Sequence, residues 1–179
     1  TVDVSNRIMF FSLWFTKSLD DKNADRLIEE ADKEYKYYLE FKRKAKKHLL
    51  SESEEKVINL KDITGSNALI KIYDTITNSF IYELDIHGEK NKLTRGQLTN
   101  YVKDPDQKIR KAAYQSLYIP YSKNDDVLNE IYRSLILDWK NESVSLRKYP
   151  EPISARNFGN DVSDKTINAL LNVCKKNRT

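Results

Sequence analysis

Residues 104–149 hold two helical patterns in succession, and they constrain the fold more than any other part of the chain. The first pattern begins at Asp104, whose side chain can accept hydrogen bonds from the free backbone N–H groups of a helix start. Ile109, Ala113 and Leu117 then recur every four residues and therefore share one face of a helix. We expect an amphipathic helix that packs against neighbours along this face.

Pro120 separates the two patterns, because its ring removes a backbone donor and crowds the preceding turn. We expect a kink or a break near Ile119 and a new helix from Ser122 or Asn124 to Lys148. The apolar residues of this second helix recur at helical spacing: Val127, Leu128, Ile131, Leu135 and Trp139. Such a helix is long enough to cross a small domain.

The rest of the chain shares this preference for helices. Only 4 of the 179 residues are Gly and 4 are Pro, and few helix breakers favour long helices over a many-stranded sheet. The exception is residues 80–94, where apolar and polar side chains alternate before a turn at Gly88. The predicted fold class is therefore mainly α, a multi-helix, bundle-like lobe with one small β-hairpin.

We expect a single lobe over residues 1–179, built from three segments. Residues 1–48 form the amino-terminal helices, and residues 49–103 form helices plus the hairpin. Residues 104–179 form the long kinked helix, an extended Pro-rich turn and a terminal helix that starts at Ser163. Residue 1 is Thr and not Met, and both ends look like cuts, so we interpret the chain as a fragment.

Charge and cysteine content narrow the functional classes. The net charge is +4, a mild excess that does not by itself indicate a nucleic-acid-binding protein. Cys174 is the only cysteine, which excludes an internal disulfide framework. No apolar run approaches the roughly 18 residues of a membrane span, so we expect no membrane partner and a cytoplasmic location.

The sequence contains no recognisable metal or catalytic motif. His48, His87 and Cys174 are far apart, and neither H-E-x-x-H nor C-x-x-C occurs. Gly-rich phosphate loops and nucleophile triads are absent as sequence patterns as well. We therefore predict no catalytic residue and no metal ligand within this chain.

A basic run follows three tyrosines in the third predicted helix. Its members are Lys42, Arg43, Lys44, Lys46 and Lys47. In a nucleic-acid interface, such cations neutralise phosphates while aromatic rings stack on bases. The alternative is a solvated helix end, which we favour because the net charge is small. Nucleic acid is accordingly not an expected partner.

A second polar group flanks the Pro-rich turn. Its members are Arg147, Tyr149, Arg156 and Asn157. These side chains could point into a groove and hold the backbone or the carboxylate of a peptide. The alternative is that they only tie down the loop.

Several segments, in the right order, resemble the amino-terminal part of oligoendopeptidase F and its relatives, zinc metallo-oligopeptidases akin to thimet oligopeptidase. Residues 104–114 are similar to the D-x-x-x-R-x-A-A-Y helix of that family, and Arg147-Lys148-Tyr149 is similar to its Arg-Gly-Tyr turn, with Lys148 in place of the usual Gly. The other segments that carry the resemblance are residues 50–56, 64–74, 86–90 and 162–173.

The resemblance implies a lobe that walls one side of a peptide channel and limits substrate size, but is inactive alone. It also implies a catalytic domain missing from this chain, in which two His and a Glu hold zinc and the Glu of the H-E-x-x-H motif activates water, and it implies that the parent hydrolyses short peptides. The implied partners are that catalytic domain and peptide substrates, and the exposed surface could let the fragment self-associate.

The runner-up hypothesis comes from the basic run alone. It is a stand-alone helical binding or adaptor module for acidic partners or RNA. A parent protein that encodes H-E-x-x-H favours the first hypothesis, whereas salt-sensitive RNA binding by this chain favours the second.

Overall fold

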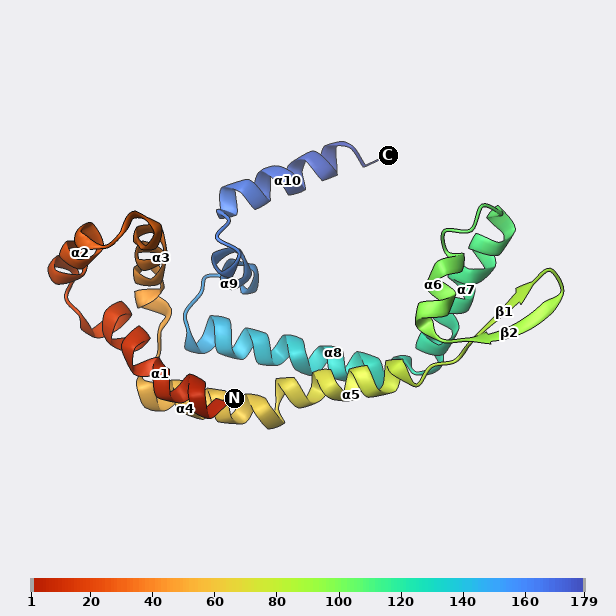
Figure 1. Ribbon diagram of the computed structural model, residues 1–179, viewed down its shortest axis with the longest axis horizontal. Helices are drawn as coiled ribbons and strands as arrows, with labels where there is room; N and C mark the ends of the chain where they lie inside the picture. Colours follow the sequence, from red (N-terminus) through yellow and green to blue (C-terminus); the bar gives the residue numbers. More distant parts are fainter. Residues whose placement is uncertain (1, 179) are drawn as a thin grey trace. The chain divides into compact units, whose positions relative to one another are not determined.

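The computed structural model describes residues 2–178 and is built mainly from helices (Figure 1). In chain order, the elements are α1 (Val2–Leu13), the π-helical η1 (Trp14–Ser18), α2 (Asp21–Glu30), α3 (Lys33–Lys44), the 3₁₀-helical η2 (Ala45–His48), α4 (Glu52–Thr64), α5 (Ser66–Asn78), β1 (Tyr82–Ile86), β2 (Glu89–Leu93), α6 (Arg95–Tyr101), α7 (Gln107–Lys123), α8 (Asp125–Lys140), the π-helical η3 (Asn141–Leu146), α9 (Pro152–Gly159) and α10 (Asp164–Lys176). The predicted fold class, mainly α with one β-hairpin, is confirmed.

The chain divides into two compact units. Unit 1 contains the chain up to Lys61 and again from Leu137 onward, and unit 2 contains Asp62–Ile136. The boundaries fall inside α4 and α8, whereas the predicted segments end at residues 48 and 103. Unit 2 is thus inserted, in sequence, into unit 1.

Unit 2 is organised by its hairpin, which α6 and α7 flank in Figure 1. The antiparallel strands pair Tyr82 with Leu93 and Ile86 with Glu89. The connecting residues His87 and Gly88 both have positive φ, 53° and 91°, as the favoured two-residue hairpin turn requires.

The alternating pattern of the hairpin creates the core of unit 2. Phe80, Tyr82 and Leu84 are buried together with Leu98 of α6 and Ala113 of α7. On the neighbouring turn of α7, the Ser116 hydroxyl donates to the Glu83 carbonyl at 2.6 Å. The predicted inward face of residues 80–86 and the predicted face of α7 therefore meet in one cluster.

Local capping explains where several helices begin. The Asp20 side chain accepts from Asn23 N–H at α2, and the Ser163 side chain accepts from Thr166 N–H at α10, as predicted for Ser163. Thr94 and Gln97 exchange the two hydrogen bonds of a capping box at α6.

Three expectations for the second half of the chain were wrong. The helix cap is Asp106 and not Asp104, because Asp106 accepts from Lys108 N–H while Asp104 accepts from the N–H of Asp106. α7 also runs through Pro120 to Lys123, so no break occurs near Ile119, and the next helix follows Asn124, one of the two expected starting points. Finally, the Pro-rich turn is not wholly extended, because α9 begins at Pro152, whose fixed φ suits a first helical turn.

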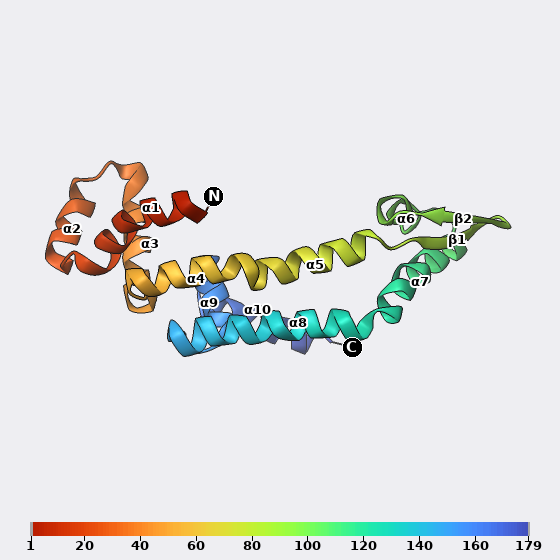
Figure 2. The ribbon, with the colours of Figure 1, turned by 90° about the horizontal axis from the view of Figure 1, so that it is seen from below.

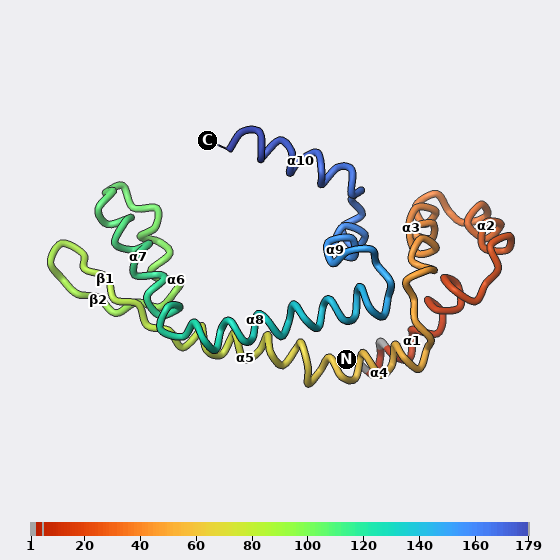
Figure 3. The backbone as a smooth tube through the Cα atoms, turned by 180° about the vertical axis from the view of Figure 1, so that it is seen from behind, coloured from red at the N-terminus to blue at the C-terminus, as the bar shows by residue number. Residues whose placement is uncertain are grey.

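In unit 1, α1 to α3 lie together near the amino-terminal end of the ribbon (Figure 2). Arg43 of α3 donates to the carbonyls of Phe15, Thr16 and Leu19, at 2.6 to 3.1 Å. One guanidinium thus satisfies acceptors that the end of η1 leaves open. Farther along, α9 and α10 meet at a corner (Figure 3), and the residues around this corner form the candidate site.

Candidate functional site

The candidate site is a hollow in unit 1 with a volume of about 350 Å³. It lies where the end of α3–η2, the segment after η3 and the α9–α10 corner come together. The residues that line it are Lys44, Lys47, His48, Tyr149, Pro150, Ser154, Asn157, Phe158, Val162, Ser163 and Asp164. It therefore brings members of the two predicted groups, the basic run and the group around the Pro-rich turn, to one place.

His48 forms one wall of the hollow and is 7% exposed. Its Nδ1 lies 2.7 Å from the Arg147 carbonyl oxygen. Because a carbonyl only accepts, Nδ1 carries the proton of the neutral ring, and Nε2 is left as an acceptor. The imidazole stacks on Tyr149, with 3.6 Å between ring centroids, and meets the edge of Phe158.

Arg147 lies behind this wall and does not line the hollow. Its guanidinium donates two hydrogen bonds to the Glu55 carboxylate, at 2.6 and 2.8 Å, and Nε donates to Glu142 at 2.7 Å. Such a bidentate pair fixes orientation as well as charge. Arg147 therefore holds the segment before Tyr149 in place. This role corresponds to the second interpretation of this group, in which its side chains fix the loop and do not contact a peptide.

The ionic network shifts the pKa values of its members. Burial raises the pKa of Glu55, but the hydrogen bonds from Arg147 and from Leu50 N–H outweigh burial, so that pKa lies below its usual range. The hydrogen bond to Glu55 raises the pKa of Arg147 despite burial. Burial also raises the pKa of Tyr149, against a smaller lowering effect of the Arg147 charge.

Asn157 is buried, and its Nδ2 donates to the Asp164 carboxylate at 2.7 Å, across the α9–α10 corner. A second hollow of about 320 Å³ lies on α9 and α10 and is also lined by Asn157 and Asp164. The fourth predicted residue, Arg156, lines neither hollow. Its guanidinium lies 5.2 Å from the ring centroid of Trp139.

The members of the basic run make different contacts. Arg43 and Lys46 both bond to the Asp21 carboxylate, and Arg43 is further engaged by the carbonyls near η1. Lys42 lies 5.3 Å from the centroid of the Tyr38 ring, and Lys44 lies 5.5 Å from that of Tyr37. Lys44 and Lys47 are the two members that reach the candidate hollow.

The Tyr37 ring under Lys44 is itself held at the α9–α10 corner. Its hydroxyl donates to the Asp161 carboxylate, and this hydrogen bond raises the pKa of Tyr37. Phe41, one turn later, stacks on Phe158 with centroids 5.0 Å apart. These contacts join α3 to α9 beside the hollow.

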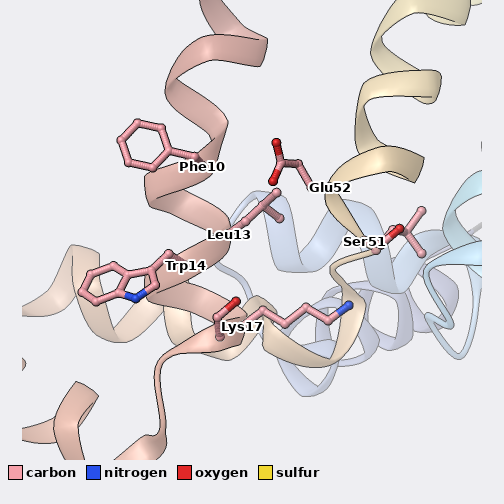
Figure 4. Close-up of a pocket in the computed structure, with 8 residues that line it drawn as sticks. Phe10, Leu13, Trp14, Lys17, Ser51 and Glu52 are labelled. Atoms are coloured by element: carbon pink, nitrogen blue, oxygen red, sulfur yellow. The ribbon is translucent and has the colours of Figure 1, made fainter.

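A larger hollow of about 840 Å³ lies between the end of α1–η1 and the start of α4, also in unit 1 (Figure 4). Phe10, Leu13 and Trp14 give it an apolar wall, and Ser51 and Glu52 lie on the α4 side. Its lysine, Lys17, is already bound to the Leu49 carbonyl at 3.0 Å. This hollow offers apolar surface but few polar groups for chemistry.

Among residues 2–178, no three His, Cys, Asp or Glu side chains lie close enough together to hold a metal ion. The chain therefore does not fit a zinc site of its own within that range, and we derive no catalytic step from it. Nor does any helix in that part of the chain combine the length and apolar character needed to cross a bilayer.

The sequence did not reveal all residues of the site. Glu55 lies in the first turn of α4, and no local pattern indicates that it is the ion-pair partner of a residue 92 positions away. Phe158 and Asp164 carried no local signal, and no pattern in the sequence predicts that His48 is buried. The only sequence feature that indicated this site was the turn Arg147-Lys148-Tyr149, which is similar to a turn of the family.

Comparisons with known proteins agree with this fold. A family model described as oligopeptidase F matches residues 16–81. An oligoendopeptidase F homolog from Borreliella burgdorferi is 29% identical over 178 residues, which cover 97% of this chain and 29% of the relative. Oligopeptidase PepF from Bacillus subtilis is 21% identical over 160 residues, which cover 88% of this chain and 24% of that protein. The chain thus spans less than a third of the length of these relatives.

A solved structure supports the same relationship at the level of the fold. The crystal structure of oligoendopeptidase-F from Enterococcus faecium matches 98% of this chain and 35% of that one, with a TM-score of 0.81 and 19% identity. The resemblance expected from the ordered motifs is therefore confirmed: this chain is similar in sequence to part of oligoendopeptidase F-like peptidases and shares the helical fold of one of them.

Proposed function

We propose that this chain is the non-catalytic amino-terminal lobe of a zinc-dependent oligopeptidase. In the parent protein it walls one side of a peptide channel and so limits the size of the substrate. The alignment of 97% of the chain with 29% of an oligoendopeptidase F homolog is the observation that carries this proposal. The H-E-x-x-H helix that binds zinc and activates water lies, in this proposal, in a catalytic domain outside these residues.

The surface of the chain supports a role beside another domain. Large apolar side chains are more than 40% exposed on several helices: Ile8, Phe10 and Phe11 on α1, Val57 and Leu60 on α4, Ile70 and Ile72 on α5, Tyr132 and Ile136 on α8, and Leu170 and Val173 on α10. Extensive exposed apolar surface commonly marks a site that another protein segment covers. A catalytic domain in the same protein is the partner that we propose.

The decisive experiment compares the parent protein with this 179-residue chain. Both are incubated with internally quenched peptides of increasing length and with a folded protein that carries the same cleavable sequence. We expect the parent to cleave the short peptides, to lose activity with a chelator and to regain it with Zn²⁺. The 179-residue chain should cleave none of them.

Three results would contradict the proposal. They are a parent without H-E-x-x-H, cleavage of the folded protein as fast as of the short peptides, and peptide cleavage by the 179-residue chain itself. RNA binding by this chain that weakens steeply with salt would instead favour a stand-alone module that uses the basic run.

A further inference from the structure

The hollow beside His48 contains a polar atom without a partner. His48 is 93% buried, being 7% exposed, and Arg147 occupies its Nδ1. Among the residues that the structure describes, no group bonds its Nε2. The side chain nevertheless lines the hollow, so Nε2 is the ring atom available to a ligand. In the neutral ring this nitrogen accepts a hydrogen bond, so it calls for a ligand with an N–H or O–H donor.

Charge gives the second requirement. Lys44 and Lys47 line the same hollow and are exposed, while Asp164 is the one carboxylate in its wall. The Asp164 carboxylate already receives the Asn157 amide. Two cations against one engaged carboxylate favour a ligand with a single negative charge.

Shape gives the third requirement. The wall between the polar groups is aromatic, made of the stacked His48 and Tyr149 rings and of Phe158. The volume of about 350 Å³ is near the lower end of the roughly 300–1,000 Å³ typical of small-molecule sites. A hollow of this volume suits a single apolar residue, with its backbone N–H and its carboxylate, better than a long peptide segment.

We propose that this hollow binds the carboxyl-terminal residue of a peptide. The carboxylate meets Lys44 and Lys47, the backbone N–H of the same residue donates to His48 Nε2, and an apolar side chain lies on Tyr149 and Phe158. Capture of a terminal carboxylate is a recurring mode of peptide recognition. The inference deepens the proposed function, on which it rests for the class of substrate, by naming the part of the peptide that this lobe holds.

The test uses the 179-residue chain labelled with ¹⁵N in its histidines. His48 and His87 are the only two, so His87 on the hairpin serves as an internal control. The chain is titrated with N-acetyl-leucine, with N-acetyl-leucinamide, which lacks the carboxylate, and with 4-methylpentanoate, which lacks the N–H. We expect N-acetyl-leucine to shift the His48 Nε2 resonance saturably and to leave His87 unmoved. The other two ligands should bind about tenfold more weakly, as loss of one charge-assisted or buried hydrogen bond predicts.

A matched pair of variants tests the cation. Lys47→Gln should weaken N-acetyl-leucine about fivefold, as for a solvent-exposed ion pair. Lys42→Gln makes the same change in net charge, but Lys42 does not line the hollow, so binding should be unchanged. Both residues are at the surface of α3–η2, and circular dichroism will verify that both variants stay folded.

The source of the carboxylate is tested with N-acetyl-Ala-Ala-Leu. Binding at least as tight as that of N-acetyl-leucine supports a peptide end, whereas exclusion of the longer ligand would overturn the proposal in favour of a free acylamino acid. Equal shifts by the amide and the acid, or equal weakening by the two lysine variants, would also overturn it. Since binding is measured without the parent protein, peptidase activity without binding sinks only this inference, and binding without activity sinks only the proposed function.

Discussion

The contacts that stabilise unit 1 internally differ from those that stabilise unit 2. Unit 2 has an apolar cluster, Phe80, Tyr82, Leu84, Leu98 and Ala113, that comes from one continuous stretch of sequence. Unit 1 is closed around its candidate site by a polar network in which Arg147 bonds Glu55 and Glu142. Apolar burial tolerates many sequences of similar volume, whereas a buried ion pair fails when either partner is lost. The two units should therefore respond to different substitutions and to different conditions.

The largest effect is expected from Leu98→Ala in unit 2. Leu98 is 0% exposed, and removing a buried leucine side chain costs about 4 kcal/mol in the free energy of unfolding, through lost burial and the cavity left behind. Hydrogen exchange of the β1 and β2 amides will measure it. The volume-conserving Leu98→Met should cost less than about 1.5 kcal/mol.

The same variant tests whether the two units are independent. Both tryptophans, Trp14 and Trp139, lie in unit 1. Tryptophan fluorescence during urea unfolding should therefore change little in Leu98→Ala. If hydrogen exchange of the hairpin amides and tryptophan fluorescence reported the same loss of stability, the two units would unfold as one cooperative unit.

The next largest effect is expected from Arg147→Ala in unit 1. It leaves the Glu55 carboxylate, whose side chain is 10% exposed, without its cationic partner and with only the Leu50 N–H, and we expect a loss of about 3 kcal/mol in the free energy of unfolding. Here the tryptophan signal should shift and the hairpin amides should not. Arg156→Ala is the matched control, because its exposed guanidinium only covers Trp139 and should contribute about 1 kcal/mol or less.

Acid should separate the units without any substitution. The pKa of Glu55 is lowered in the folded chain, so its contribution to stability is complete above the ordinary glutamate pKa of about 4.3 and is lost as the pH falls through the lower folded-state value. The urea midpoint from tryptophan fluorescence should therefore fall with acidification in this range. Glu55→Gln should flatten that part of the profile, and an identical slope in both proteins would rule out the ion pair as its cause.

The smallest effect, and a gain, is expected at Lys148. This residue has φ of 59°, a left-handed conformation that costs a non-glycine residue about 1–2 kcal/mol. Lys148→Gly should raise the free energy of unfolding by about 0.5–1 kcal/mol, after the greater freedom of glycine in the unfolded chain is subtracted. Lys148→Ala is the control, because both variants lose the exposed hydrogen bond from Lys148 Nζ to the Ser145 carbonyl but only the glycine relieves the strain, so the alanine variant should not stabilise.

Local signals predicted much of this fold. The cap at Ser163 involves residues three apart, and alternation over seven residues predicts the first strand of the hairpin. Where two carboxylates compete at one helix start, as Asp104 and Asp106 do, sequence could not choose between them, because both can accept from nearby N–H groups.

The candidate site was less predictable, because its geometry depends on contacts across long stretches of chain. Tyr149 and Asn157 were predicted as site residues, and both line the hollow. No sequence pattern near Arg147, however, predicts Glu55 as its partner. Likewise, the sequence of the basic run does not distinguish Arg43, which donates to carbonyls, from Lys47, which lines the hollow. The difference depends on the packing of α3 against η1 and α9.

The insertion of unit 2 between the two parts of unit 1 has a consequence for biosynthesis. Once Leu128 has emerged from the ribosome, every member of the hairpin cluster and of the apolar residues packed around it is free of the ribosome, so this cluster can form while the chain is still growing. Glu55 must wait for 92 more residues before its guanidinium partner emerges. The order of synthesis thus allows the inserted hairpin region to be completed before the hollow of unit 1, whose walls include residues up to Asp164.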